Sequence, residues 1–314
     1  MANRINIALF GFGRIGRNLF RLGYDNPKYN FVAISDFGSS EALHYLLARD
    51  SIHGLMDDEV RLDGNHLIVK NQRPRLINGG EPGNVPWDAF DVDIVVDATG
   101  RFLKREELAA HLRAGAKRVF ISRNPHDTID RFVIPGINEK SIETTDQIIS
   151  TTSSTTQVLA LMVKMLDEKF GLERAMMTTV HAYTADQPLA DAAGVDLRRS
   201  RSAVENIIPN STRAPKIVMD IMPEYKGKID GIAFNVPVPN GSCVDLTTEL
   251  KNVPSIDDAN QAIKKYSLES LNGIVGYTSD PIVSSDVIGR EETMVFDEKA
   301  TMITKDLLLK TLCW

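Results

Sequence analysis

The chain has 314 residues, of which 43% are hydrophobic and 25% are charged, and its formal net charge is −6. This length and ordinary globular balance predict two folded domains with sizeable cores. The acidic balance argues against a nucleic-acid binder, and no apolar run is long enough for a membrane-spanning helix. The start, MANRINIALFGFG, lacks the long apolar run and cleavage site of a secretory signal, so we expect a cytoplasmic protein.

The first half of the sequence alternates predicted strands and helices. Residues 5–10 form a continuous apolar run, which is typical of a strand buried on both faces, and a helix is predicted over 14–26. Further strands are predicted over 31–36, 67–70, 93–99 and 118–122, with a helix over 106–116. Because alternating strands and helices join parallel strands by right-handed crossovers, residues 1–150 are predicted to form a doubly wound parallel sheet of the α/β class.

The pattern changes after Ser150. A helix is predicted over 155–170, ending at a capping glycine, and another over 255–269. Strands are predicted over 175–184, 228–239 and 242–250, with a loop-like stretch over 186–201. Proline-containing runs such as NVPVPNG suit strand edges and turns, so residues 151–314 are predicted to form an α+β domain with a mostly antiparallel sheet.

The chain contains two cysteines, Cys243 and Cys313, and both lie in apolar, strand-like segments. We expect them to be buried structural thiols. Neither a disulfide framework nor a metal site is predicted from their spacing.

The segment GFGRIG follows a predicted strand and opens a predicted helix. Gly11 permits the tight turn, Gly13 lets the backbone approach a pyrophosphate, and Gly16 lets helix and strand pack closely. The helix start, with Arg14 and Ile15, provides N–H donors and a partial positive charge for phosphates.

Asp36 ends the next predicted strand, 20 residues after Gly16. Its carboxylate can accept hydrogen bonds from both hydroxyls of an adenosine ribose and would repel a 2′-phosphate, which favours NAD over NADP. A glycine motif alone is weak evidence, because a tight turn between packed elements also explains it. Here strand, glycines, helix, second strand and acidic residue occur together, which predicts a Rossmann-type domain that binds NAD.

A run of hydroxyl-bearing residues over 150–156 leads directly into the helix predicted from Thr155. The helix start would direct N–H groups at Ser153, Ser154 and Thr155, and such a site holds an anion or a developing negative charge. One of these hydroxyls could simply be the N-cap. His181 lies in the apolar segment TTVHAYTAD, where a lone histidine is more often structural. These two segments alone leave a capped helix and a reaction centre as alternatives.

Eight sequence blocks occur in a characteristic order between residues 5 and 314: GFGRIGR, DSIHG, DATGRF, GAKRVFIS, TTVHAYT, NIIPNST, PVPNGS and VDLT. They resemble the glyceraldehyde-3-phosphate dehydrogenase family, which includes erythrose-4-phosphate dehydrogenases. The resemblance covers essentially the whole chain. It implies a homotetramer that uses NAD and inorganic phosphate to oxidise a small phosphorylated aldehyde to an acyl phosphate. In the family, a cysteine forms a hemithioacetal, hydride passes to nicotinamide, and phosphate cleaves the thioester.

The resemblance also implies roles for individual residues. The family motif SCTT falls on residues 153–156, so Ser154 takes the position of the nucleophilic cysteine, and His181 takes that of the base. Ser122 matches a nicotinamide-side contact. Residues 182–201 correspond to an S-shaped loop that lines the cofactor pocket of a neighbouring subunit in relatives. The residues expected to bind the two phosphate groups are Ser153, Thr155, Thr184, Asp186, Arg201 and Thr212.

The sequence departs from the family at the nucleophile. An alcohol is far less acidic and less nucleophilic than a thiol at neutral pH, so His181 has to remove the proton of Ser154 during attack. We therefore expect turnover to be lower by roughly 10³ to 10⁶. The serine is explained either by an engineered change that traps substrate or cofactor, or by natural divergence.

Further departures lie around this position. Asn235 stands where the family has arginine in AFRVPTPN, which removes a cation and its forked donors. Arg213 stands where the family has glycine, and it either restores that cation or blocks the phosphate pocket. Gln157 and Val158 replace the Asn and Cys of TTNC. Relatives also continue after the position of Trp314 with YDNEWGY and a last helix, which supplies an asparagine to the nicotinamide amide.

Three functions are therefore compared. The leading one is a phosphorylating, NAD-dependent aldehyde dehydrogenase that is impaired by Ser154. The alternative is a catalytically silent NAD-binding homologue that acts as a sensor or assembly partner. A serine hydrolase built on Ser154 and His181 is disfavoured, because the sequence has no G-x-S-x-G elbow and no obvious carboxylate to orient the histidine.

Overall fold

The computed structural model describes residues 4–305 and 307–314. They form two compact units: the first contains residues up to 133 together with 140–152, and the second contains 134–139 and 153–314. Residues 134–139 are predicted from the sequence to belong to the first domain. They group with the second unit because Ile134 lies in its core and Lys164 donates a hydrogen bond to the carbonyl of Gly136 at 2.7 Å.

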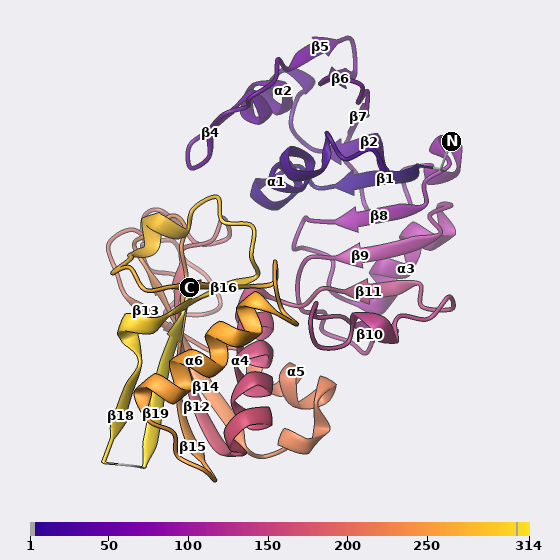
Figure 1. Cartoon of the computed structure of the whole chain (residues 1–314). Helices are drawn as coiled ribbons and strands as arrows, with labels where there is room; N and C mark the ends of the chain where they lie inside the picture. The colour runs from indigo at the N-terminus through magenta and orange to yellow at the C-terminus, as the bar shows by residue number, and fades with distance from the viewer. Residues whose placement is uncertain (1–3, 306) are drawn as a thin grey trace. The chain divides into compact units, whose positions relative to one another are not determined.

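The first unit is built on a nine-stranded sheet (Figure 1). Its strands are β1 (Ile5–Phe10), β2 (Tyr29–Asp36), β5 (Arg61–Asp63), β6 (His66–Ile68), β7 (Arg75–Asn78), β8 (Ile94–Asp97), β9 (Arg118–Ile121), β10 (Arg131–Phe132) and β11 (Ile148–Ser150). The strand order is β10-β11-β9-β8-β1-β2-β7-β6-β5. The pairings from β10 to β7 are parallel, and only β6 and β5 add antiparallel pairs at one edge.

Helices and short elements connect these strands. They are α1 (Arg14–Gly23), α2 (Ser40–Ala48), the hairpin β3 (Arg49–Asp50) and β4 (Gly54–Leu55), η1 (Trp87–Phe90), α3 (Arg105–Arg113) and η2 (Glu139–Ser141). Strand β1 is buried on both faces: Leu9 shares a cluster with Phe20 of α1, and Phe10 shares another with Trp87 of η1. The doubly wound Rossmann-type fold predicted from the sequence is therefore confirmed.

The second unit contains a mixed sheet. Its strands are β12 (Leu172–Ala182), β13 (Ile208–Asn210), β14 (Ile229–Val236), β15 (Cys243–Leu250), β16 (Val275–Thr278), β17 (Met294–Asp297), β18 (Met302–Thr304) and β19 (Leu308–Cys313). The order is β13-β14-β12-β15-β19-β17-β16, with β18 paired to β19. The pairs β12–β14 and β16–β17 are parallel and the other pairs are antiparallel, which confirms a mostly antiparallel sheet.

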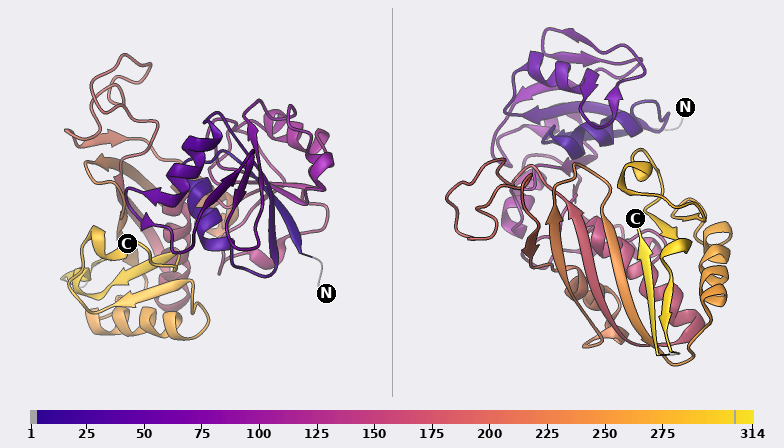
Figure 2. Two further views of the ribbon diagram at one scale, coloured as in Figure 1. Left: turned by 90° about the horizontal axis from the view of Figure 1, so that it is seen from above. Right: turned by 90° about the vertical axis from the view of Figure 1, so that its left-hand side faces the viewer.

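Three helices pack on one face of this sheet, as the right-hand view of Figure 2 shows. They are α4 (Ser154–Phe170), α5 (Ala214–Ile221) and α6 (Ile256–Leu268), and the short elements are η3 (Pro223–Tyr225), η4 (Ser284–Val287) and η5 (Glu298–Ala300). Helix α4 ends at Gly171, whose φ of +70° fits the predicted glycine cap.

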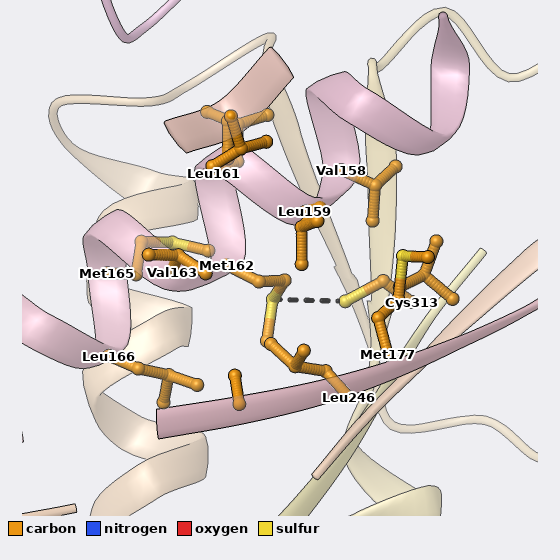
Figure 3. Close-up of a cluster of buried hydrophobic side chains, with 14 of the residues drawn as sticks. Val158, Leu159, Leu161, Met162, Val163, Met165, Leu166, Met177, Leu246 and Cys313 are labelled. Carbon is orange, nitrogen blue, oxygen red and sulfur yellow. Dashed lines mark hydrogen bonds between the residues drawn. The ribbon is translucent and has the colours of Figure 1, made fainter. Parts of the chain in front are cut away.

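The core of the second unit forms around α4 (Figure 3). Leu159, Met162 and Leu166 of this helix are fully or almost fully buried. The Cys313 thiol is also buried and donates to the Met162 sulfur at 3.2 Å, so the prediction of a buried structural thiol is confirmed there. It is wrong for Cys243, which is only half-buried because it begins β15 at the end of the sheet.

Candidate active site

Gly11 and Gly13 lie in the turn from β1 to α1 and Gly16 lies in the first turn of α1, and each of the three has a different environment. Gly11 has a φ of +94°, and a Cβ there would stand 2.8 Å from the backbone nitrogen of Thr99. A Cβ on Gly16 would stand 2.1 Å from the carbonyl oxygen of Gly11, so only glycine permits this close packing. A Cβ on Gly13 would meet no heavy atom within 4 Å. The surface over Gly13 is therefore open, as approach of a pyrophosphate requires.

The N-cap of α1 is Gly13, which has no side chain to cap the first N–H groups of the helix, as in helices whose start binds a phosphate. Arg14 begins the helix, and Ile15 is 46% exposed. Asp36 ends β2, where one carboxylate oxygen accepts from the N–H of Phe12 at 2.6 Å and the other from the N–H of Gly38 at 3.0 Å. These bonds fix the carboxylate and leave further lone pairs for hydroxyl donors.

A pocket of ≈ 170 Å³ brings these residues together in the first unit. Gly11, Gly13 and Asp36 line it together with Thr99 and Arg101. Ser122 follows β9, where its N–H and hydroxyl donate to the carbonyl of Asp97 at 3.3 and 3.4 Å.

The hydroxyl-bearing residues of the run 150–156 have different structural roles. Ser153 is the N-cap of α4: its hydroxyl accepts from the N–H of Thr156 at 3.3 Å, and the two hydroxyls lie 2.8 Å apart. The capping alternative therefore applies to Ser153. Thr152 is buried and has a φ of +64°, which is a strained conformation for a β-branched residue. Ser154 is exposed at the first position of α4.

Ser154 lines a pocket of ≈ 190 Å³ within the second unit. Cys243, Arg290 and Trp314 are among the other lining residues. The Arg290 guanidinium is bound by both carboxylate oxygens of Glu292, at 2.7 and 3.0 Å. Burial raises the pKa of the Cys243 thiol, so this thiol is a poor substitute for the missing nucleophile.

Thr155 ties the start of α4 to strand β12. Its hydroxyl lies 3.4 Å from that of Thr179, which donates its single proton to the carbonyl of Cys243 at 3.1 Å. Thr155 must therefore donate in the contact with Thr179. Since Thr155 is buried and its proton is used, this geometry favours a structural role over the predicted phosphate contact.

His181 lies two residues after Thr179 in β12, so both side chains emerge from the same face of the strand. Its Nδ1 lies 2.6 Å from the carbonyl oxygen of Ala182. A carbonyl only accepts, so Nδ1 carries the proton and Nε2 of the neutral ring is the acceptor. A backbone carbonyl thus orients the ring, whereas a serine-hydrolase triad uses a carboxylate.

Asn235 lies beside His181 in the register between β12 and β14. It is 8% exposed. Its amide donates to the carbonyl of Ala182 at 3.4 Å, and its oxygen accepts from the amide of Asn210 at 3.3 Å. This arrangement favours support of the carbonyl that orients His181, rather than a contact with a substrate phosphate.

The residues of the S-shaped loop that are predicted to bind phosphate do not all contact one another. The Thr184 hydroxyl donates to Asp186 at 2.5 Å, and Asp186 forms an ion pair with Arg199. Arg201 instead pairs with Asp191 at 3.0 Å. The structure thus joins Thr184 and Asp186 to Arg199, which is not among the phosphate contacts predicted from the sequence. The run RRSR holds three arginines in four positions, and a loop without periodicity gives no signal for choosing among them.

Thr212 and Arg213 lie just before α5. The Thr212 hydroxyl accepts from the N–H of Ala214 at 3.2 Å, and Arg213 occupies the N-cap position without a side-chain cap. Thr212 lines a different pocket of ≈ 690 Å³, in which Met176 and Lys216 also take part. Thr212 therefore does not line the Ser154 pocket.

Two family models match the chain. The model described as the NAD binding domain of glyceraldehyde 3-phosphate dehydrogenase matches residues 5–105, and the model of its C-terminal domain matches residues 153–314. The chain belongs to the glyceraldehyde-3-phosphate dehydrogenase family. Residues 5–105 are therefore that family's NAD-binding domain, and NAD is the cofactor.

The chain is similar over almost its whole length to named dehydrogenases. It is 42% identical to glyceraldehyde-3-phosphate dehydrogenase 1 of Bacillus subtilis (strain 168) and to the glyceraldehyde-3-phosphate dehydrogenase of Geobacillus stearothermophilus. It is 39% identical to the glyceraldehyde-3-phosphate dehydrogenase of Podospora anserina. Each comparison covers 99% of the chain and 92% of the relative. In the part of the chain that the structure describes, no helix has the length and apolar character needed to cross a membrane.

Proposed function

We propose that this protein oxidises glyceraldehyde 3-phosphate, or a similar phosphorylated aldehyde, to an acyl phosphate with NAD and inorganic phosphate. The arrangement around Ser154 carries the proposal: an exposed hydroxyl at the first position of α4, whose start is tied to the strand that bears His181. Arg199, with Thr184 and Asp186, supplies a cationic group for phosphate recognition in place of Arg201.

The residues of the second unit account for the acyl chemistry. The Ser154 oxygen attacks the aldehyde carbon while Nε2 of His181 takes its proton, and the N–H groups at the start of α4 stabilise the alkoxide that forms. His181 returns this proton to the alkoxide, which gives a neutral hemiacetal and leaves the imidazole neutral again. When bound, NAD supplies the acceptor for the hydride of the hemiacetal carbon.

As the hydride leaves, His181 takes the proton of the hemiacetal hydroxyl, so an ester on Ser154 and a protonated His181 remain after oxidation. Attack by inorganic phosphate breaks the ester bond to Ser154, whose oxygen recovers a proton from His181. Both the attack by the alcohol and the transfer from an ester are slower than the corresponding thiol steps. We therefore propose that the enzyme turns over slowly with serine at position 154.

Replacement of Ser154 tests this proposal. Ser154→Cys is expected to raise the rate of NADH formation from glyceraldehyde 3-phosphate and phosphate about 10³-fold or more. If the variant is folded and binds NAD but shows no gain, the alternative of a catalytically silent NAD-binding homologue replaces the enzymatic account. Calorimetric titration with NAD distinguishes that outcome from loss of the cofactor site.

We also propose a cytoplasmic homotetramer. Met176 and Ile232 lie exposed on the sheet face opposite the helices, and apolar groups in such a position are suited to subunit contact. The free thiols of Cys243 and Cys313 fit a reducing compartment. Light scattering during size-exclusion chromatography tests the assembly, and a monomer at micromolar concentration contradicts it.

A further inference from the structure

A chain of buried contacts reaches from α3 to the loop that lines the dinucleotide pocket. The loop begins after β8, where one carboxylate oxygen of Asp97 accepts from both the N–H and the hydroxyl of Thr99, at 2.9 and 2.6 Å. Thr99 lines the pocket and packs directly on Gly11. The conformation of Asp97 therefore determines the shape of this wall of the pocket.

The other carboxylate oxygen of Asp97 faces His111 of α3. It lies 3.6 Å from Nε2 of the imidazole, and both residues are buried, with exposures of 3% and 0%. Among the described residues, neither atom has a hydrogen-bond partner. A buried carboxylate oxygen without compensation is unfavourable, so an imidazole N–H that faces it, even at 3.6 Å, stabilises the side chain in this position.

A hydrogen bond from Trp87 fixes the tautomer of the neutral His111 ring. The indole N–H donates to Nδ1 of His111 at 3.0 Å, so Nδ1 is an acceptor. The proton of the neutral ring is consequently on Nε2, the atom that faces Asp97. The His111 ring also packs edge-on against Phe10, with centroids 4.6 Å apart, and Phe10 lines the same pocket.

We propose that His111 is a positioning residue for NAD. Its Nε2–H faces the buried Asp97 carboxylate at 3.6 Å, Asp97 accepts from Thr99, and Thr99 shapes the wall of the pocket, which His111 itself does not line. This inference rests on the dinucleotide pocket of the proposed function, because it concerns how that pocket keeps its shape.

Three substitutions at one position separate positioning from simple packing. His111→Gln places an amide N–H near the position of Nε2 and keeps a donor for Asp97. His111→Asn keeps an acceptor near Nδ1 for Trp87 but has no donor that reaches Asp97. His111→Phe keeps the ring against Phe10 and has neither nitrogen. We expect the Asn and Phe variants to raise the Kd for NAD about tenfold, and the Gln variant to stay within about twofold of the unchanged protein.

Titration calorimetry with NAD measures these constants, and thermal melting measures stability in the same samples. The control is Leu108→Ala, a fully buried change in the same helix but in a separate cluster. It is expected to lower Tm without changing the Kd. If the His111 variants fail to fold, Asp97→Asn provides the test: it keeps an acceptor for Thr99, turns an amide donor toward His111, and is expected to raise the Kd about tenfold.

Equal Kd changes in the Gln and Asn variants, or a Kd change in Leu108→Ala that follows its loss of stability, would overturn the proposal. Unchanged NAD affinity in the folded Asn and Phe variants, or in Asp97→Asn, would also overturn it. If the unchanged protein itself does not bind NAD, both the dinucleotide site and this inference are rejected. If it binds and the variants bind equally well, only the inference fails.

Discussion

The hydroxyl of Thr155 donates to the hydroxyl of Thr179, 3.4 Å away, and so joins the first turn of α4 to β12. Ser154 precedes Thr155 in the helix, and His181 follows Thr179 by two residues in the strand. One side-chain contact therefore ties the element that carries the nucleophile to the element that carries the base.

This contact gives the first prediction. Thr179→Val leaves the buried Thr155 hydroxyl without an acceptor and is expected to lower the free energy of unfolding by roughly 1–2 kcal/mol. The double change Thr155→Val with Thr179→Val removes both partners, so it should recover part of this loss. Urea denaturation of the single and double variants measures the coupling. Strictly additive losses would show that the hydroxyls do not interact.

The two arginines of the S-shaped loop give a matched pair. Arg199→Ala removes the cation that the structure places with Asp186, and is expected to raise KM for the phosphorylated aldehyde about tenfold or more, because charge-assisted contacts to phosphate are lost. Arg201→Ala removes only an exposed pair with Asp191 and should change KM less than about twofold. Both are measured in the Ser154→Cys background. The opposite ranking would restore Arg201 as the phosphate contact.

Substitutions of Gly13 and Gly16 are expected to have different effects, one on the affinity for NAD and the other on stability. Gly13→Ala meets no neighbouring atom and has an ordinary φ of −73°, so Tm should stay unchanged while the Kd for NAD rises about tenfold or more. Gly16→Ala collides with the carbonyl of Gly11 and should lower stability by roughly 2 kcal/mol. Melting curves and calorimetric titration distinguish the two effects. Tight NAD binding by folded Gly13→Ala would place the pyrophosphate elsewhere.

Asp50 gives a prediction of pH dependence. Burial raises the pKa of its carboxyl, but the N–H donors of His53 and Ile52, with Arg17, hold it net below its usual range. A lowered pKa in the folded state stabilises the protein above the unfolded value of about 3.9, and this stabilisation is lost as pH falls toward the folded value. Asp50→Asn should therefore melt below the unchanged protein at pH 7, with the difference shrinking below about pH 4.

The control for Asp50 is Asp63→Asn, which removes an exposed pair with Arg73. Exposed pairs contribute little, so its melting temperature should match that of the unchanged protein across the same pH range. A difference for Asp50→Asn that stays constant through acid pH would contradict the assigned linkage.

Much of the fold follows from local sequence. Apolar runs predict strands β1 and β9. Helical spacing followed by a glycine predicts the bounds of α4 to within one residue. The sequence patterns do not predict helix α2, although the Ser39 side chain caps it. The strands after residue 274 were missed because they are short and depend on distant partners, as in the pairing of β19 with β15.

The site follows from sequence only in part. The glycine turn is local, so its spacing alone indicates the backbone geometry that the structure has. The link from Thr155 to Thr179 and the support of Ala182 by Asn235 join segments far apart in the chain, and no periodicity shows them. The choice between Arg199 and Arg201 depends on the path of an irregular loop, which only the structure supplies.

The central claim is that the start of α4 presents residue 154 to an aldehyde, with His181 as its base. Phosphate-dependent NADH formation by Ser154→Cys, with and without His181→Asn, tests it most directly. We expect Ser154→Cys to exceed the unchanged protein about 10³-fold or more, and the added His181→Asn to remove roughly 10²-fold or more of that gain. Equal rates in all three proteins, each folded and saturated with NAD, would contradict the account.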